Sequence, residues 1–413
     1  MQTIPEGELW VEASPEVTDA KLPRCTIVIL NWDGLQHLDG CFESLRALEY
    51  PEDRLEVILV DNGSTDGSLE HMRRKHSWVR LVVNERNTGF SAGCNQGARE
   101  AKDAEVLCFL NNDIRVEPSF LRALVAPIVA GRCESTTARM LSWDGKLLNS
   151  AGGGMNFHGI GIQRGYLEEA APEYDRPSLT LFACGGAMAM KAHIFDEVGG
   201  FDESFFAYYE DVDLGWRTWV RGYSIQYVPD AVCYHHHSST SGRVPIERLR
   251  VLQVRNPLLA CFKNYGDESM AKFLPAMLAL ATRRAYLSAE VRDPEAYRIE
   301  ALGAPGKSGL FAKLRRRFSR RTEGTEAVGR VGLADLVAIN DLLGQWDFWM
   351  ERRREVQAAR RRSDTEIFKL FLRPLWCIEQ DYGYRELHEG LTDFLGLAEL
   401  FEGATRMKRD PKS

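Results

Sequence analysis

Three acidic side chains lie close together in the segment FDESFFAYYEDVDLGWR, where aromatic residues flank Glu210, Asp211 and Asp213 at the predicted start of a helix. A positioned carboxylate can take a proton from a hydroxyl nucleophile, and like-charge repulsion and aromatic surroundings both raise its pKa and make it a better base. Glu210 and Asp211 point about 100° apart on a helix, so only one of them is expected to face a substrate. Helix-terminal charge complementarity is the alternative explanation of these acids.

A further acid, Asp113, lies in the segment LNNDIRVEP, just beyond the apolar run VLCFL. In that position a carboxylate can bind a divalent cation that is shared with phosphate oxygens. Three consecutive histidines, His235 to His237, also follow a short apolar run, so at least one imidazole could face the same edge of the fold as a ligand. A solvated acid and three surface imidazoles are the alternatives.

The elements that must position these residues alternate along the chain. Short apolar runs cover residues 25–30, 55–60, 79–83 and 106–110, and helical periods lie between them. This order is typical of an α/β fold with a mostly parallel sheet flanked by helices, which binds ligands at the carboxyl ends of its strands. Asn31, Asp61 and Asn112 follow the first, second and fourth strands, so we expect them at a ligand site.

Glycines mark two further places where a ligand could approach the backbone. Gly89 opens the helical segment NTGFSAGCNQGA, and we expect Gly89 and Asn95 at a nucleotide site. This segment follows the third strand, and no G-x-G-x-x-G motif follows the first, so a dehydrogenase is not indicated. Gly185 and Gly186 interrupt the apolar run LTLFACGGAMAM, as strands do where another group comes close.

The charge distribution argues against nucleic-acid binding. The net charge is −7, and residues 1–250 carry 24 Lys and Arg against 36 Asp and Glu, whereas residues 251–413 carry 28 against 23. An acidic body lacks the dense basic face that nucleic acids require. Nine scattered cysteines without a Cys-x-x-Cys pair, and an acidic N-terminus without a signal peptide, indicate a cytoplasmic protein with reduced thiols.

We expect an N-terminal extension (1–21), a catalytic domain (22–245) with an irregular loop or lid over residues 132–177, and a helical C-terminal region (246–413). That region carries basic clusters at residues 313–321, 352–354 and 360–362. Solvated helix faces explain the clusters. Attachment to the inner face of the plasma membrane is the alternative, because Leu310, Phe311, Leu314 and Phe318 could form an apolar stripe beside the first cluster.

Together the motifs VDNGSTDGS, LNNDIRVEP, YYEDVDLGW and PDAVCYHHH resemble the family 2 glycosyltransferases of the GT-A fold, most closely the bacterial rhamnosyltransferase-like branch, over about residues 25–242. The resemblance implies inverting transfer of a sugar from a nucleotide diphosphate donor to a hydroxyl acceptor, with Mg²⁺ or Mn²⁺. It also implies that Asp61 holds the nucleotide base and that Asp211 is the general base. Asp113 and His235 would bind the metal or the diphosphate.

One departure from the family pattern is that Asn111 and Asn112 replace the first acid of its metal-binding motif. Metal binding is therefore expected to depend more on His235 and on the donor phosphates. The donor is expected to be a dTDP-, UDP- or GDP-sugar, with dTDP-rhamnose favoured by the resemblance alone. The acceptor is expected to be a glycan or lipid-linked hydroxyl, used in making cell-surface polysaccharide.

Two other functions fit the sequence less well. A sugar-phosphate nucleotidyltransferase needs a Gly-rich basic loop after the first strand, but that position reads NWDGLQHLDG without Lys or Arg. A non-catalytic carbohydrate-binding protein of the same fold would be indicated by loss of the paired acids. Glu210 and Asp211 are both present.

Overall fold

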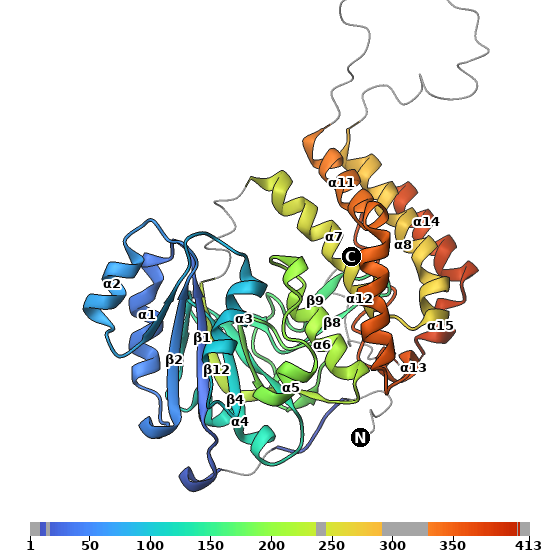
Figure 1. Cartoon of the computed structure of the whole chain (residues 1–413). Helices are drawn as coiled ribbons and strands as arrows, with labels where there is room; N and C mark the ends of the chain where they lie inside the picture. Colours follow the sequence, from blue (N-terminus) through green and yellow to red (C-terminus); the bar gives the residue numbers. More distant parts are fainter. Residues whose placement is uncertain (1–8, 14–16, 237–244, 291–328, 403, 405–413) are drawn as a thin grey trace, which may run out of the picture.

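A computed structural model describes the chain except residues 1–8, 14–16, 237–244, 291–328, 403 and 405–413 (Figure 1). The first basic cluster, at residues 313–321, and the apolar stripe beside it lie outside the described residues. No helix among the described residues is long and apolar enough to cross a bilayer.

A large mixed sheet runs in the order β10-β12-β6-β11-β4-β1-β2-β3. The principal strands are β1 (Cys25–Asn31), β2 (Leu55–Asp61), β3 (Arg80–Val83), β4 (Val106–Asn111), β6 (Ser135–Ser142), β10 (Ser178–Leu179), β11 (Ala187–Lys191) and β12 (Ile225–His235). Strand β1 pairs in parallel with β2 and β4, in a register that sets Asn31 beside Asp61 and Leu30 beside Asn111. The predicted mostly parallel sheet is confirmed, and its polar strand ends lie side by side.

Helices cover both faces of this sheet. The helices of the first part are α1 (Leu35–Arg46), α2 (Ser68–Lys75), α3 (Phe90–Glu100), α4 (Phe120–Val129), α5 (Ala192–Glu197) and α6 (Glu210–Val220). Ile27 and Ile29 of β1 pack in one buried cluster with residues of α1, α2 and α4, whereas Val28 packs in the other with residues of α3, α5 and α6. Continuous apolar runs are expected for strands that are buried on both faces.

The expectation of an irregular loop or lid over residues 132–177 was wrong where the stretch enters the sheet, although residues 156–160 and much of 164–177 are irregular. This stretch contains β6, which lies inside the sheet between β11 and β12, together with β7 (Leu148–Ser150), β8 (Gly153–Met155) and β9 (Gly161–Gln163). The sequence of β6, STTARMLS, has no apolar run. Its hydroxyls are buried because they are bonded internally: Ser135 donates to the carbonyl of Ala189 and Thr136 to that of Leu124.

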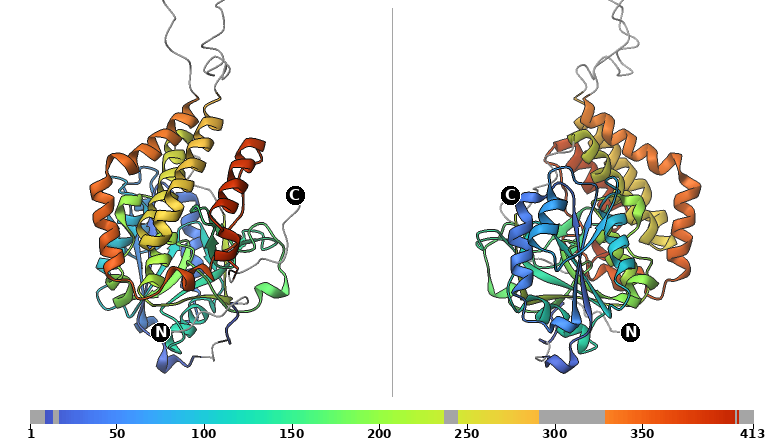
Figure 2. Two further views of the ribbon diagram at one scale, coloured as in Figure 1. Left: turned by 90° about the vertical axis from the view of Figure 1, so that its right-hand side faces the viewer. Right: turned by 60° about the vertical axis from the view of Figure 1, so that its left-hand side comes forward.

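The C-terminal helices pack along one side of the sheet layer (Figure 2). They are α7 (Ile246–Asn264), α8 (Asp267–Ser288), α11 (Arg330–Gly344), α12 (Trp346–Ala358), α13 (Asp364–Phe368), α14 (Tyr382–Phe394) and α15 (Leu397–Leu400). Their apolar residues belong to the same buried cluster as α6, as the ring contact of Tyr265 with Trp216 shows, with centroids 4.7 Å apart. The proposed division at residue 245 therefore crosses a continuous core.

The later basic clusters are not simply solvated helix faces, contrary to expectation. Arg353 is buried and donates to the carbonyls of Phe262 and Tyr265, each at 2.6 Å. Arg362 is also buried and lies over the ring of Trp219. Arg353 therefore satisfies carbonyls at the end of α7, and Arg362 donates to the carbonyl of Gly222 just after α6, so both join the C-terminal segment to the core.

Two glycines of α3 allow that helix to lie close against β1. A Cβ atom at Gly93 would be 2.3 Å from a methyl carbon of Leu30, and one at Gly97 would be 2.3 Å from a methyl carbon of Val28. Both glycines therefore serve helix–sheet packing. This packing explains why glycine occurs at these two positions, and no bound nucleotide is needed to explain it.

Substituting Gly93→Ala should destabilise the protein by about 1–3 kcal/mol, because the added methyl overpacks this contact. Gly390→Ala in α14 is the matched control, since nothing lies within 4 Å of its Cβ position. The control should be neutral or more stable by about 0.5–1 kcal/mol. Urea unfolding measures both, and equal stability of Gly93→Ala and the unsubstituted protein would contradict the packing.

Candidate active site

Asn31 links the polar ends of the central strands. It is fully buried, and its Nδ2 donates to Asp61 Oδ1 at 3.1 Å and to Ser64 Oγ at 3.0 Å. Its Oδ1 accepts from Asn112 Nδ2 at 2.7 Å. Gly34 permits this arrangement, because a Cβ there would be 2.2 Å from Asn112 Nδ2. Three of the predicted site residues are therefore brought together in one network, which we call the strand-end cluster.

The loops after β1 and β2 are tied to each other beside this cluster. Asp33 Oδ1 accepts from the amide of Thr65 at 2.6 Å, and Asp66 Oδ2 accepts from the amide of Leu35 at 2.9 Å. The amide of Ser64 donates to Asp61 Oδ2 at 3.0 Å. The Asp61 carboxylate is thus oriented by both loops. Ser64 was not predicted; its position in VDNGSTDGS was the available signal.

Asp113 and His235 lie against each other, with His235 Nε2 3.3 Å from Asp113 Oδ1 and both side chains largely buried. Antiparallel pairing of β5 (Ile114–Val116) with β12 sets His235 opposite Ile114 and so beside this acid. The next histidine, His236, stacks on Trp143 at 3.8 Å between centroids, and His237 lies outside the described residues. The geometry therefore distinguishes His235 within the triplet.

Asn149 gives His235 its orientation. Its Oδ1 lies 3.3 Å from His235 Nδ1. When Nδ1–H donates to this oxygen, the lone pair of Nε2 is directed toward the Asp113 carboxylate. Two ligands of one octahedral cation are about 3 Å apart when each bond is about 2.1 Å, so a divalent ion fits this pair of donors. Asn149 was missed because it belongs to no recognisable motif.

The paired acids begin α6 after a strained loop. Phe206, Tyr208 and Tyr209 have φ values of 63°, 68° and 68°, and left-handed conformations of such residues cost about 1–3 kcal/mol each. Asn256 of α7 supports this loop, since its Nδ2 lies 2.7–3.0 Å from three of the loop's carbonyl oxygens. A residue of the C-terminal region therefore helps to place the acids.

Glu210 and Asp211 differ in their partners. Asp211 Oδ2 accepts from the amide of Gly185 at 3.0 Å and its Oδ1 from the amide of Val212 at 2.8 Å, while burial raises its pKa. Glu210 is buried, and its Oε2 has no hydrogen-bond partner among the described residues. Burial and the charge of Asp211 raise the pKa of Glu210 to about 8. Burial therefore favours the protonated form of both acids, and only the Asp211 carboxylate has backbone amides that stabilise its charge.

Gly185 and Gly186 let the backbone lie close to the side chains of Asp211 and Asn111. A Cβ at Gly185 would be 3.4 Å from that of Asp211, and one at Gly186 would be 3.1 Å from Asn111 Nδ2. Their predicted contact with a bound ligand stays a prediction. Gly89, with φ of 90°, leaves no room for a Cβ beside the carbonyl oxygen of Phe206, 2.6 Å away.

Two residues singled out in the sequence are engaged elsewhere. Asp213 is fully buried in ion pairs with Arg217 at 2.8 Å and Lys263 at 3.0 Å, so it anchors α6. Asn95 exchanges hydrogen bonds with the backbone of Phe201 and lies on the wall of a cavity of about 400 Å³ between α3, α6 and α12. The structure does not bring Asn95 into the strand-end cluster.

Comparisons with known proteins point to one family. The family model "Glycosyl transferase family 2" matches residues 26–199, and "Glycosyl transferase family group 2" matches residues 167–286. The N-acetylglucosaminyl-diphospho-decaprenol L-rhamnosyltransferase of Mycobacterium tuberculosis is 30% identical over 250 residues, which cover 54% of this chain and 79% of the relative. The low-salt glycan biosynthesis hexosyltransferase Agl10 of Haloferax volcanii is 23% identical, covering 49% and 64%.

Among solved structures, that of GalNAc-T7 with UDP, GalNAc and Mn²⁺ aligns with a TM-score of 0.51 at 20% identity, over 62% of this chain and 51% of that one. This likeness shows the GT-A type of fold. These matches do not favour a nucleotidyltransferase or a non-catalytic protein. The chain belongs to glycosyltransferase family 2 and is a glycosyltransferase that uses a nucleotide-sugar donor.

Proposed function

We propose that the enzyme inverts the donor sugar, with Asp211 as the general base. The observation that carries this proposal is the difference between the two acids: Asp211 is oriented by two backbone amides, whereas Glu210 Oε2 has no hydrogen-bond partner among the described residues. An acceptor hydroxyl would give its proton to Asp211 as its oxygen attacks the anomeric carbon from the face opposite the leaving diphosphate. The raised pKa of Asp211 makes it a stronger base for this transfer.

The donor nucleotide would bind at the strand-end cluster. Asp61 would accept a hydrogen bond from the base, and Asn31 keeps the Asp61 carboxylate in place. Asp113 and His235 would hold Mg²⁺ or Mn²⁺, which when bound neutralises charge on the leaving diphosphate. Asn112 adds no charge here because it is an amide bonded to Asn31. The site therefore supplies one carboxylate and one imidazole, and donor phosphates would complete the ligand set.

The substrate class is proposed from the Mycobacterium tuberculosis relative. Its name specifies transfer of L-rhamnose to an N-acetylglucosaminyl-diphospho-decaprenol. We propose a rhamnose donor, carried as dTDP-rhamnose, and a lipid-linked glycan acceptor of the kind used for cell-surface polysaccharide.

Contact with a membrane surface is proposed from the shared tip of three helices. Ile246 at the start of α7 is 70% exposed, and Tyr286 near the end of α8 and Leu333 near the start of α11 are also exposed. Figure 1 shows the start of α7, the end of α8 and the start of α11 on the side of the molecule where β1 and β2 end. A lipid-linked acceptor could then reach the site from a bilayer on that side.

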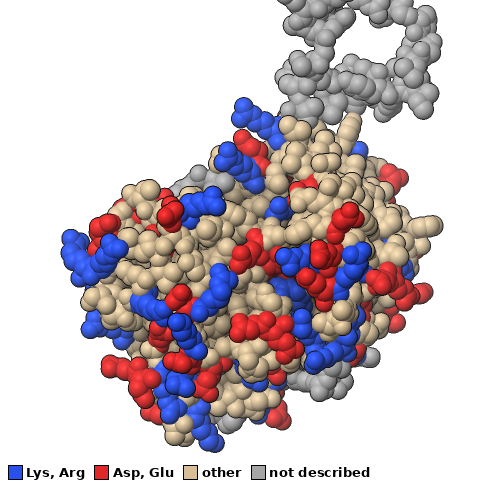
Figure 3. Space-filling view, viewed as in Figure 1, with Lys and Arg blue, Asp and Glu red and all other residues tan. Residues whose placement is uncertain are grey.

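Charge on the folded body contributes little to this membrane proposal. Figure 3 shows basic and acidic side chains intermingled over the visible face. The basic excess lies in the sequence between α8 and α11, where residues 291–328 contain nine Lys and Arg against five Asp and Glu. A bilayer with anionic lipids suits an apolar tip that is joined to such a segment.

Asp211→Asn should retain donor affinity and lower transfer by roughly 10²–10⁴-fold, because a positioned base contributes a factor of that size. Asp113→Asn should instead weaken Mn²⁺-dependent donor binding. Calorimetry with nucleotide sugars and transfer of a labelled sugar to a lipid-linked acceptor measure the two effects. Asp230→Asn, an exposed acid on β12, is the control. Near-normal turnover of a folded Asp211→Asn protein would move the role to Glu210.

Glu210 also predicts a pH dependence of stability. Its pKa is raised from 4.5 to about 8 on folding, so the unfolded chain loses this proton first and stability falls as pH rises between those values. Glu210→Gln should flatten that decline in urea unfolding at pH 5, 7 and 8.5, whereas Glu52→Gln, on an exposed turn, should not. An unchanged slope in Glu210→Gln would contradict its burial as a neutral acid.

The membrane proposal predicts that Leu333→Glu weakens co-sedimentation with anionic vesicles by at least about tenfold, since a buried aliphatic side chain contributes about 1.5–3 kcal/mol. Leu343→Glu is the matched control, because Leu343 is exposed on the same helix but near its other end. Equal binding of all three proteins would exclude this tip. A change in oligomeric state would instead assign the tip to a second copy of the chain.

A further inference from the structure

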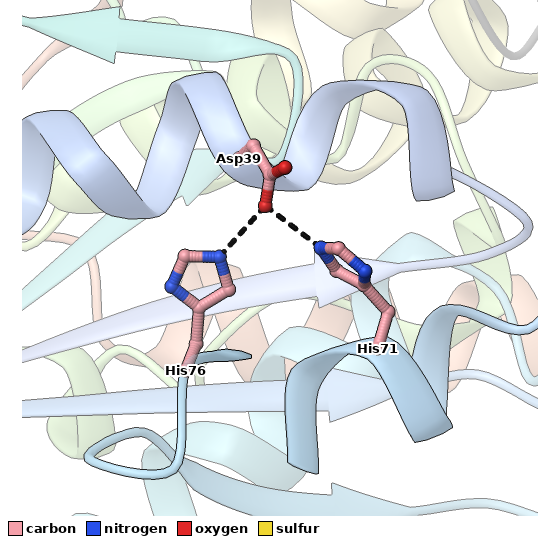
Figure 4. A group of neighbouring side chains, drawn as sticks. All are labelled: Asp39, His71 and His76. Carbon is pink, nitrogen blue, oxygen red and sulfur yellow. Dashed lines mark hydrogen bonds and ion pairs between the residues drawn. The ribbon is translucent and has the colours of Figure 1, made fainter. Parts of the chain in front are cut away.

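A cluster of metal-binding side chains lies between α1 and α2 and consists of Asp39, His71 and His76. Nε2 of His71 is 2.7 Å and Nε2 of His76 is 2.9 Å from the same oxygen, Oδ1 of Asp39. Figure 4 shows both rings directed at this oxygen, one from α2 and one from the turn that follows it. The cluster shares no residue with the pair formed by Asp113 and His235.

We propose that this cluster is a second divalent metal site, of the zinc type. Its candidate ligand atoms all lie within 4.8 Å of one another. Zinc bonds of about 2.0–2.1 Å in a tetrahedral site place neighbouring ligands about 3.3 Å apart. The Asp39 oxygen must therefore move by about half an ångström. Asp39 has room to do so because its side chain is 44% exposed.

The two imidazoles are already fixed in place. The side chain of His76 is only 4% exposed and its ring lies against that of Phe42, with centroids 5.4 Å apart, and the side chain of His71 is 18% exposed. His76 also caps the C-terminal end of α2, where the negative end of the helix dipole favours a cation. The cluster therefore combines two largely buried imidazoles with a carboxylate that is free to move, as a metal site requires.

The ligand types select the metal. Two imidazole nitrogens and one carboxylate suit Zn²⁺, Co²⁺ or Ni²⁺, whereas Mg²⁺ and Mn²⁺ prefer oxygen ligands. A bound ion would join α1 to α2, the helices whose preceding loops meet through Asp33 and Asp66. The site would then stiffen the donor side of the enzyme without taking part in sugar transfer.

The competing account is a cluster held by hydrogen bonds alone, in which Lys75 supplies the cation. Lys75 Nζ is 2.7 Å from Asp39 Oδ2 and 2.9 Å from Glu43 Oε1. Lys75 contacts Oδ2 of Asp39, whereas the metal would bind Oδ1. Because Lys75 is partly exposed, it can keep this contact or pair with Glu43 alone when a metal binds. The two accounts differ in whether the protein binds zinc.

Calorimetric titration of the chelator-treated full chain with Zn²⁺ tests the proposal, together with the visible absorption spectrum of Co²⁺. One tight site is expected that persists in Asp113→Asn, shows a tetrahedral Co²⁺ spectrum and raises the melting temperature. His71→Ala and Asp39→Asn should each weaken the affinity of the site for Zn²⁺ by at least about tenfold. Even the loss of a group that only hydrogen-bonds to a metal ligand lowers metal affinity by about that factor. His193→Ala, an exposed histidine on α5, should bind normally.

Three results would overturn the proposal. They are absence of a tight site, unchanged affinity in both His71→Ala and Asp39→Asn, and loss of the site in Asp113→Asn alone, which would assign the zinc to the catalytic pair. His71 and Asp39 are partly exposed, so both variants are expected to fold. The buried His76 is left unchanged because its removal could destabilise the protein.

Discussion

The buried charge of Asp213 is the constraint on which the acid side of the active site depends. Its carboxylate contacts Arg217 and Lys263 and accepts from Asn264 Nδ2 at 2.9 Å. Removing one partner of such a buried ion pair typically lowers the free energy of unfolding by about 3–5 kcal/mol, because the remaining charge is buried without a counterion or solvation by water. Helix α6 is thereby fixed to α7, and with it the two acids that begin α6.

The site is assembled from two halves of different construction. The register of the parallel strands sets Asn31 beside Asp61 and Leu30 beside Asn111, so the strand-end half, where we propose that the donor binds, follows from the sheet. The acid half depends on tertiary support: Asn256 holds the carbonyls of a strained loop, and the amide of Gly185 holds Asp211. Strain of this kind persists only where the surroundings determine the backbone.

The same distinction explains what could be predicted from sequence. Strand β1 and the residues that follow the central strands were found because apolar runs and strand ends are local signals. Strand β6 was missed because its buried side chains are hydroxyls that find partners in the fold. Asn149 and Asn256 contact segments that are far away in sequence, and no local pattern marks them. Asn95 was predicted at the nucleotide site because its neighbourhood is Gly-rich, but its partners are residues 201 and 203.

The contact of Lys263 with Asp213 also orders events during synthesis. Residues 25–235 leave the ribosome with every strand of the large sheet, yet Asp213 has no ammonium partner until α7 has followed. Until then the helix that bears the acids contains a carboxylate that only Arg217 neutralises. The nascent chain therefore completes the ion pairs of Asp213 only after about forty residues beyond α6 have emerged, and until then the helix that begins with Glu210 and Asp211 lacks its attachment to α7.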